Sequence, residues 1–230
     1  MLLVVKSFVQ DIKMNDLQKS MFLLSEGDAY FERNHQVNHS GTFDGNETVI
    51  QAITRVLPTI LTGPARLLEI GCGEGKRLEY LSQHFGVECH GIDPSAKAVA
   101  VAKAAGIQAL QGTADKLPYE AGTFDIVVFG FCLYLCDRVD LFRIAQEADR
   151  VLKTEAWLVI HDFYATTPTR AEYHHKAGIF SYKMDYRRLF DWHPAYTCHA
   201  QELNHHGRGG FTDDPQEWVA TSLIRKTKIG

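Results

Sequence analysis

Short apolar runs alternate with segments of helical periodicity between residue 65 and residue 161. The runs are rich in β-branched and aliphatic residues, whereas the segments between them gather their apolar residues on one helical face. The fourth run is apolar almost throughout, which is typical of a strand covered on both faces. The five expected strands are ARLLEI, VECHGI, IQALQG, FDIVVFGF and AWLVIHDF.

This alternation predicts the α/β fold class, because strand–helix–strand repeats build parallel sheets with right-handed crossovers. Two further runs, AYTCHAQEL and EWVATSLIRK, indicate a closing pair of strands. The expected fold is a doubly wound, mostly parallel seven-stranded sheet with helices on both faces. We expect one domain over residues 1–230, with an N-terminal helical cap (1–60), a core (61–162), an insertion (163–194) and closing strands (195–230).

The N-terminal cap has helical character in two places. Residues 14–34 predict one or two helices broken near Gly27, and residues 44–57 predict a helix that ends at Pro58. The insertion is aromatic and rich in histidine, and it shows little clean periodicity.

Composition narrows the functional classes. The chain has 230 residues, a net charge of -4 and a pI of about 6.2, so bulk charge does not favour nucleic acid or anionic lipid. The most apolar segment, 126–136, is too short to span a membrane. The five cysteines form no CxxC pair, and a disulfide framework is not expected. We therefore expect a soluble, cytoplasmic protein without a membrane partner.

The glycine-rich segment at 69–75 (EIGCGEG) indicates a ligand close to the backbone, at the carboxyl end of a strand. A dinucleotide fingerprint would need a third glycine at position 76, which is Lys76. A P-loop would need glycine at position 70 and Ser or Thr at position 77, where the chain has Ile70 and Arg77. Both classes are excluded, which leaves the pattern E-x-G-x-G-x-G.

With this pattern the chain resembles the class I S-adenosylmethionine (SAM)-dependent methyltransferases. The resemblance also uses GIDPS at 91–95 and GTADKLPYEAGTFDIVV at 112–128, and it covers about residues 65–162. It implies a Rossmann-like fold, SAM as cofactor and S-adenosylhomocysteine (SAH) as product.

Several residues are then expected to bind the cofactor. Glu69 is placed to bind the ammonium group of SAM, and Asp93 to accept hydrogen bonds from the ribose hydroxyls. The resemblance implies that Asp115 accepts from the adenine amino group and that the Ala114 amide meets the ring. The simpler alternatives are a strand-end carboxylate for Glu69, a helix cap for Asp93 and an ordinary loop acid for Asp115. The full expected set is Glu69, Gly71, Cys72, Gly73, Gly75, Asp93, Pro94, Ala114, Asp115, Phe129, Tyr30 and Arg33.

Four of these residues have further interpretations. Cys72 is expected to be a small residue packed inside the turn. Phe129 begins a segment expected to line the sulfonium side. Tyr30 and Arg33 are candidates to close over the SAM carboxylate, or else they belong to an ordinary packed helix.

Catalytic residues are harder to assign, because methyl transfer depends mainly on positioning. A base is needed only for a hydroxyl or a protonated amine. His161, at the end of the fifth strand, is the first candidate, and His174 and His175 in the insertion follow. A structural role is the alternative for each. A metal site is not expected, because the chain has neither HExxH nor a Cys/His quartet.

The expected reaction is methylation of a small molecule at oxygen or nitrogen. Basic residues outnumber acidic ones in the insertion and lie among aromatic residues, which suggests a lid for an anionic acceptor or, alternatively, a solvated helical face. An RNA or protein methyltransferase and a noncatalytic SAM-binding protein are the rival functions. Nucleic acid is disfavoured because [DN]-P-P-Y is absent after the fourth strand, which continues as FGFCLYL. The oligomeric state is expected to be a monomer or a homodimer.

Overall fold

The computed structural model describes residues 18–38, 45–61, 63–208 and 210–229. Its centre is a seven-stranded sheet with the order β3-β2-β1-β4-β5-β9-β8. Strands β1 to β5 pair in parallel, and β9 runs antiparallel to both of its neighbours. The predicted fold class is therefore confirmed. The strands are β1 (Arg66–Ile70), β2 (Glu88–Asp93), β3 (Gln108–Gln111), β4 (Phe124–Gly130), β5 (Leu152–Phe163), β8 (Tyr196–His205) and β9 (Trp218–Lys226).

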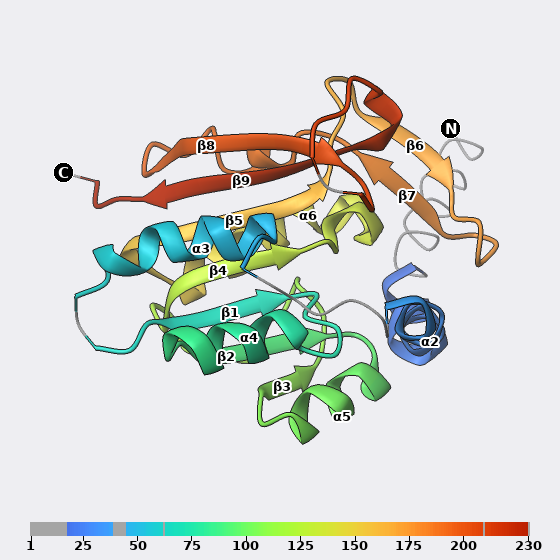
Figure 1. Ribbon diagram of the computed structural model, residues 1–230. Coiled ribbons are helices and arrows are strands. Elements are labelled where there is room, and N and C mark those ends of the chain that lie inside the picture. The colour runs from blue at the N-terminus through green and yellow to red at the C-terminus, as the bar shows by residue number, and fades with distance from the viewer. Residues whose placement is uncertain (1–17, 39–44, 62, 209, 230) are drawn as a thin grey trace, which may run out of the picture.

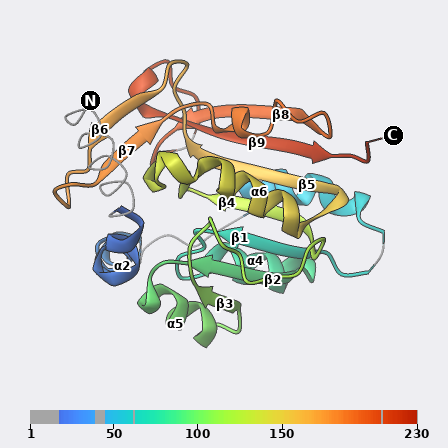
Figure 2. The same cartoon turned by 180° about the vertical axis from the view of Figure 1, so that it is seen from behind.

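The protein has two hydrophobic cores, one on each face of the sheet, because successive side chains of a strand point to opposite faces. Leu67 and Ile126 pack under α3, α4 and α5, which lie in front of the sheet in Figure 1. Their neighbours Leu68 and Val127 pack under α6 and the 3-10 turn η5 on the other face, seen in Figure 2. The bounds are α3 (Thr48–Val56), α4 (Lys76–Phe85), α5 (Ala96–Ala104), α6 (Leu141–Val151) and η5 (Tyr186–Leu189).

Two elements outside the sheet lie by the carboxyl ends of β1 and β4 (Figure 1). The first is α2 (Gly27–Asn38), which continues from a π-helical turn, η1 (Phe22–Glu26). The predicted break near Gly27 is where π-helical hydrogen bonding gives way to α-helical. The second is a hairpin of β6 (Thr169–Glu172) and β7 (Phe180–Lys183). Residues 14–17 of the first predicted helix lie outside the described residues.

The hairpin was not predicted from the sequence. Its strands have only four residues each, and neither strand alternates between buried and exposed positions. The period-two signal of a half-buried strand is therefore absent. By contrast, the closing pair was predicted and is confirmed as β8 and β9. The second predicted cap helix is α3, and a 3-10 turn, Leu57–Thr59, contains Pro58. Among the described residues, no helix has the length and apolarity needed to cross a bilayer.

Phe124 should be a major contributor to stability. Its ring is fully buried and lies 5.2 Å from the His90 ring and 5.0 Å from the Tyr119 ring. Phe124→Ala is expected to lower the free energy of unfolding by about 3–5 kcal/mol. The matched change Phe142→Ala, at a side chain that is 76% exposed, should alter it by less than about 0.5 kcal/mol. Urea denaturation of both variants measures the two changes in the free energy of unfolding. Equal losses in the two variants would contradict a major role of Phe124 in stability.

Candidate functional site

The glycine turn follows β1 at the point where the strand order reverses, which is where ligands bind in open α/β sheets. Gly71, Gly73 and Gly75 have φ angles of 80°, 53° and 77°, in the left-handed region that favours glycine. The Gly71 amide donates to the Ile92 carbonyl at 2.8 Å, which ties the turn to β2. A Cβ atom added to Gly71 would lie 2.6 Å from the Cβ of Cys132, so only glycine fits there.

Cys72 is a packing residue inside this turn. It is buried, and a Cβ atom added to Gly91 in β2 would lie 2.5 Å from its Sγ atom. Burial raises the pKa of the Cys72 thiol well above its ordinary value. These observations agree with the expectation of a small packed residue.

Asp93 holds the glycine turn against the loop that follows β2. Its Oδ2 atom accepts from the Gly73 amide and its Oδ1 atom from the Ser95 amide, both at 2.9 Å. Burial raises the pKa of this carboxyl, while the two amides favour its ionised form. The expected ribose-binding residue therefore also organises the turn. Pro94, between Asp93 and Ser95, belongs to the same loop.

Glu69 lies at the end of β1 within a buried ion-pair network. The Arg77 guanidinium donates from Nη1 to Glu69 Oε1, and from Nε and Nη2 to the Glu47 carboxylate at 3.1 and 3.2 Å. Burial raises the pKa of Glu69 to about 7, although Arg77 opposes the shift. The other carboxylate oxygen of Glu69, Oε2, is buried and has no hydrogen-bond partner in the described part of the chain. A buried acceptor of this kind fits a ligand that brings a donor.

Asp115 presents a second buried acceptor. Its Oδ2 atom contacts Lys19 Nζ at 2.6 Å, and Lys19 also contacts Asp140 at 2.9 Å. Although burial favours the neutral form, the hydrogen bond from Lys19 holds the pKa of Asp115 below its ordinary value. Its Oδ1 atom has no hydrogen-bond partner among the described residues. Ala114, the neighbour expected to meet adenine, is also buried.

Helix α2 is attached to the loop after β2. The Asp28 carboxylate accepts from the Ser95 hydroxyl at 2.7 Å and from the Lys97 amide at 3.0 Å. A Cβ atom added to Gly27 would lie 3.2 Å from the backbone carbon of Pro94, so the two backbones approach closely. The sequence therefore places a glycine and an acid where α2 crosses this loop.

The two α2 residues expected near the cofactor lie in different surroundings. The Tyr30 hydroxyl accepts from the Tyr134 hydroxyl at 3.2 Å, in the segment after β4. Arg33 donates to Glu26 at 2.5 Å and to the Tyr173 hydroxyl in the hairpin at 2.9 Å. The guanidinium of Arg33 thus joins α2 to the hairpin, and its expected contact with the SAM carboxylate stays a prediction.

Phe129 does not have the side-chain position that the sequence suggested. Strand β4 continues to Gly130, and the Phe129 ring is fully buried, 6.5 Å from the Phe190 ring in the core under α6. Phe131 is the first aromatic residue beyond the strand, and it is only half-buried. Of the segment expected to line the sulfonium side, Phe131 therefore has a partly exposed ring, whereas Phe129 does not.

Two of the three histidines proposed as bases, His161 and His175, have different surroundings. His161 forms a 2.8 Å hydrogen bond between Nδ1 and the Thr221 hydroxyl, and burial lowers its pKa to about 4. Thr221 also contacts the Thr48 hydroxyl at 2.9 Å, which links β5 through β9 to α3. A base with so low a pKa is weak at neutral pH. His175 is exposed in the hairpin turn, 5.2 Å from the Tyr173 ring. Both catalytic roles stay predictions.

Sequence reasoning missed Lys19, Asp28, Arg77 and Asp162. Asp162 is buried near the end of β5, and its Oδ2 atom accepts from the Leu133 and Tyr134 amides at 2.7 and 3.3 Å. Burial raises its pKa to about 7. An acid at the end of the apolar run AWLVIHDF was a usable signal, because the carboxyl ends of parallel strands form the site. Lys19 and Asp28 gave no such signal.

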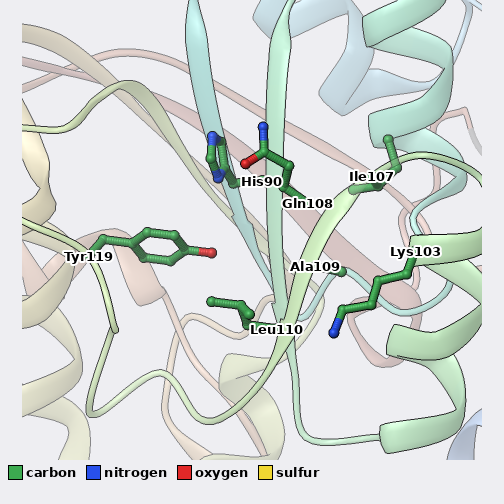
Figure 3. A pocket seen from close by; sticks show the side chains of 7 residues that line it. All are labelled: His90, Lys103, Ile107, Gln108, Ala109, Leu110 and Tyr119. Atoms are coloured by element: carbon green, nitrogen blue, oxygen red, sulfur yellow. The ribbon is translucent and has the colours of Figure 1, made fainter.

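A separate hollow of about 320 Å³ lies at the sheet edge, beside β3 (Figure 3). It contains none of the expected cofactor-binding residues. Its lining is His90, Lys103, Ile107, Gln108, Ala109, Leu110 and Tyr119.

Comparisons with known proteins agree with this geometry. Residues 68–160 match a family described as methyltransferase domain. Norajmaline N-methyltransferase of Rauvolfia serpentina is 36% identical over 105 residues, which cover 42% of this chain and 35% of that protein. Demethylmenaquinone methyltransferase of Lactococcus lactis is 34% identical over 109 residues, which cover 41% of this chain and 43% of that protein. The matched segment is thus less than half the length of either relative.

Solved structures extend the likeness in fold to most of the chain. The 1,6-didemethyltoxoflavin-N1-methyltransferase of Burkholderia thailandensis, solved with 1,6-didemethyltoxoflavin and SAH, has a TM-score of 0.67 at 15% identity. The superposed part covers 91% of this chain and 89% of the Burkholderia thailandensis chain. A SAM-dependent methyltransferase from Methanosarcina mazei has a TM-score of 0.59 at 18% identity. The likeness covers 76% of this chain and 98% of the Methanosarcina mazei chain.

Affinity for SAH should depend on pH through Glu69. With a pKa of about 7, Glu69 is protonated at lower pH and then cannot pair with the ligand ammonium. Binding favours the ionised form, so affinity should fall by roughly tenfold from pH 8 to pH 6. Calorimetric titration measures this slope. Glu69→Gln should flatten it and Glu120→Gln, at an exposed acid, should keep it. An unchanged slope in Glu69→Gln would remove Glu69 as the titrating group.

Proposed function

We propose that the chain is a class I SAM-dependent methyltransferase that transfers the methyl group of SAM to a nitrogen or oxygen atom of a small molecule, because residues 68–160 match a methyltransferase domain and the fold resembles solved SAM-dependent methyltransferases. The match covers only part of each curated relative, so the reaction and the acceptor are proposals drawn from the site.

The observation that carries the proposal is the pair of buried carboxylate oxygens without partners in the described structure, Glu69 Oε2 and Asp115 Oδ1. They lie at the end of β1 and in the loop after β3, and β2, which ends at Asp93, is between these two strands in the sheet. The two oxygens of Asp93 already accept backbone amides. SAM has a matching set of donors in its ammonium, ribose hydroxyls and adenine amino group. The residues present therefore fit SAM, with Glu69 at the ammonium, Asp93 at the ribose and Asp115 at adenine.

SAM supplies a methyl group already activated by its sulfonium, so the chain mainly has to bind, orient and exclude water. The glycine turn lets backbone approach the cofactor closely. Helix α2 is fixed over the same region by Asp28 on the β2–α5 loop, and the turn before η1 is fixed by Lys19 on Asp115. Both contacts support a role for residues 18–38 in covering the cofactor.

Nitrogen is supported as the acceptor atom by two similar proteins whose names specify N-methylation, norajmaline N-methyltransferase and 1,6-didemethyltoxoflavin-N1-methyltransferase. An anionic acceptor has less support. Arg187 pairs with Asp185 at 2.9 Å, and Arg188 lies 4.0 Å from the same carboxylate. These cations of the insertion therefore already have an acidic neighbour.

Asp93→Ala is expected to weaken SAH binding by more than about tenfold, because it removes the ribose acceptor and the anchor of the glycine turn. Calorimetry with SAM, SAH and NADH measures both affinity and cofactor class, and NADH should not bind. Asp213→Ala, at an exposed loop acid, is the control and should bind SAH normally. Unchanged SAH affinity in Asp93→Ala would refute the ribose assignment. Failure of the wild-type protein to bind either SAM or SAH would refute the function.

A further inference from the structure

Three half-buried or exposed rings gather just beyond β4 and β5, and we call them the aromatic surface: Phe131, Phe163 and His206. The Phe131 ring lies 4.8 Å from Phe163, and it stacks on His206 at 5.4 Å with an interplanar angle of 9°. His206 and Phe163 are 4.8 Å apart. Phe131 follows β4, Phe163 ends β5, and His206 follows β8, so the topology brings together rings that are far apart in the chain.

The backbone of Phe131 is strained. Its φ angle of 61° lies in the left-handed region, which is a true outlier for a bulky residue. The Phe131 amide donates to the His161 carbonyl at 2.8 Å, which fixes the segment against β5. Strain of this kind concentrates at functional sites, where the surrounding structure maintains it.

The aromatic surface adjoins the cofactor site. Cys132, next to Phe131, is the residue that a Cβ atom on Gly71 would strike. The buried Asp162 carboxylate holds the following amides of Leu133 and Tyr134, and its Oδ1 atom accepts from the Phe163 amide at 2.8 Å. Tyr134 lies 5.1 Å from Phe163 and contacts Tyr30 of α2. The segment that carries Phe131 is therefore fixed beside the glycine turn, and Tyr134 links it to α2.

We propose that the methyl acceptor is a flat aromatic nitrogen heterocycle that stacks on the aromatic surface, with a ring nitrogen of His206 accepting a hydrogen bond from its N–H or O–H group. This assignment deepens the proposed function and rests on it. Phe131 and Phe163 retain exposed area for a further ring, unlike Phe124 and Phe129 in the core.

His206 has the chemistry to act as the acceptor of that hydrogen bond. Within the described residues, no side chain hydrogen-bonds to its ring nitrogens, while its backbone amide donates to the Glu217 carbonyl at 2.7 Å. Partial burial and the nearby Lys183 lower its pKa, although Glu217 opposes the shift, and a neutral imidazole has one nitrogen that can accept a hydrogen bond. The backbone hydrogen bond thus fixes the loop after β8, and the His206 imidazole is available to accept a hydrogen bond from a ligand.

The test uses full-length protein saturated with SAH and saturation-transfer NMR of three probes. Quinolin-4-ol is flat and has a polar hydrogen, 4-methoxyquinoline is flat and has none, and decahydroquinolin-4-ol has the same skeleton without aromaticity. Both flat probes should bind, and the saturated one should not. Phe131→Leu and Phe163→Leu should each weaken the flat probes by about fivefold or more. Phe85→Leu, at the end of α4, is the control and should bind them normally.

The variants of His206 separate stacking from hydrogen bonding. His206→Phe should weaken quinolin-4-ol while sparing 4-methoxyquinoline, and His206→Ala should weaken both. Each variant's SAH affinity, measured in the same samples, reports that it is folded. If SAH binds but quinolin-4-ol does not, or binds equally well to the Phe131→Leu and Phe163→Leu variants, this inference fails and the proposed function stands. Equal binding of the saturated probe also overturns it. If SAH itself does not bind, both fail.

Discussion

The rest of the site depends on the two hydrogen bonds that the Asp93 carboxylate accepts from backbone amides. This carboxylate accepts one amide from the glycine turn and one from the loop after β2, so two neighbouring strand ends share one anchor. A buried carboxylate is stable only when such donors surround it. The glycines allow this arrangement because their left-handed φ angles turn the amide of Gly73 towards Asp93. Helix α2 then binds the same loop through Asp28.

Buried acids recur at the carboxyl ends of the strands, but they have unequal sets of partners. Asp162 accepts from three backbone amides, and Asp93 from two. Glu69 shares Arg77 with Glu47 and keeps one oxygen without a partner in the described chain. Burial accordingly raises the pKa of Glu69 to about 7, a value at which a ligand cation shifts its ionisation most easily. Asp162 and Asp93 organise the loops through these backbone amides, whereas Glu69 and Asp115 each keep one oxygen without a partner in the described chain.

The sequence predicted the sheet, the glycine turn and its acids, because these depend on local patterns and on spacing within one motif. It did not predict partners that meet only in three dimensions. Lys19 reaches Asp115 across 96 positions, and Asp28 reaches Ser95 across 67. Residues 129–133 were expected to follow the fourth strand, but β4 continues to Gly130 and keeps the Phe129 side chain in the core. The β6–β7 hairpin lacked a buried face and therefore lacked a pattern.

The two halves of the site need different chemistry, and the fold keeps them adjacent without mixing them. On the β2 side, Glu69 and Asp115 keep buried carboxylate oxygens without partners in the described chain, whereas on the β5 side, Phe131 and Phe163 present half-buried rings. Contact between Gly71 and Cys132 is the boundary, and it leaves no room for a side chain at position 71. The backbone after β4 must therefore turn sharply beside the glycine turn, and Phe131 adopts a positive φ angle there. Close approach of two backbones thus explains both the glycine and the strained phenylalanine.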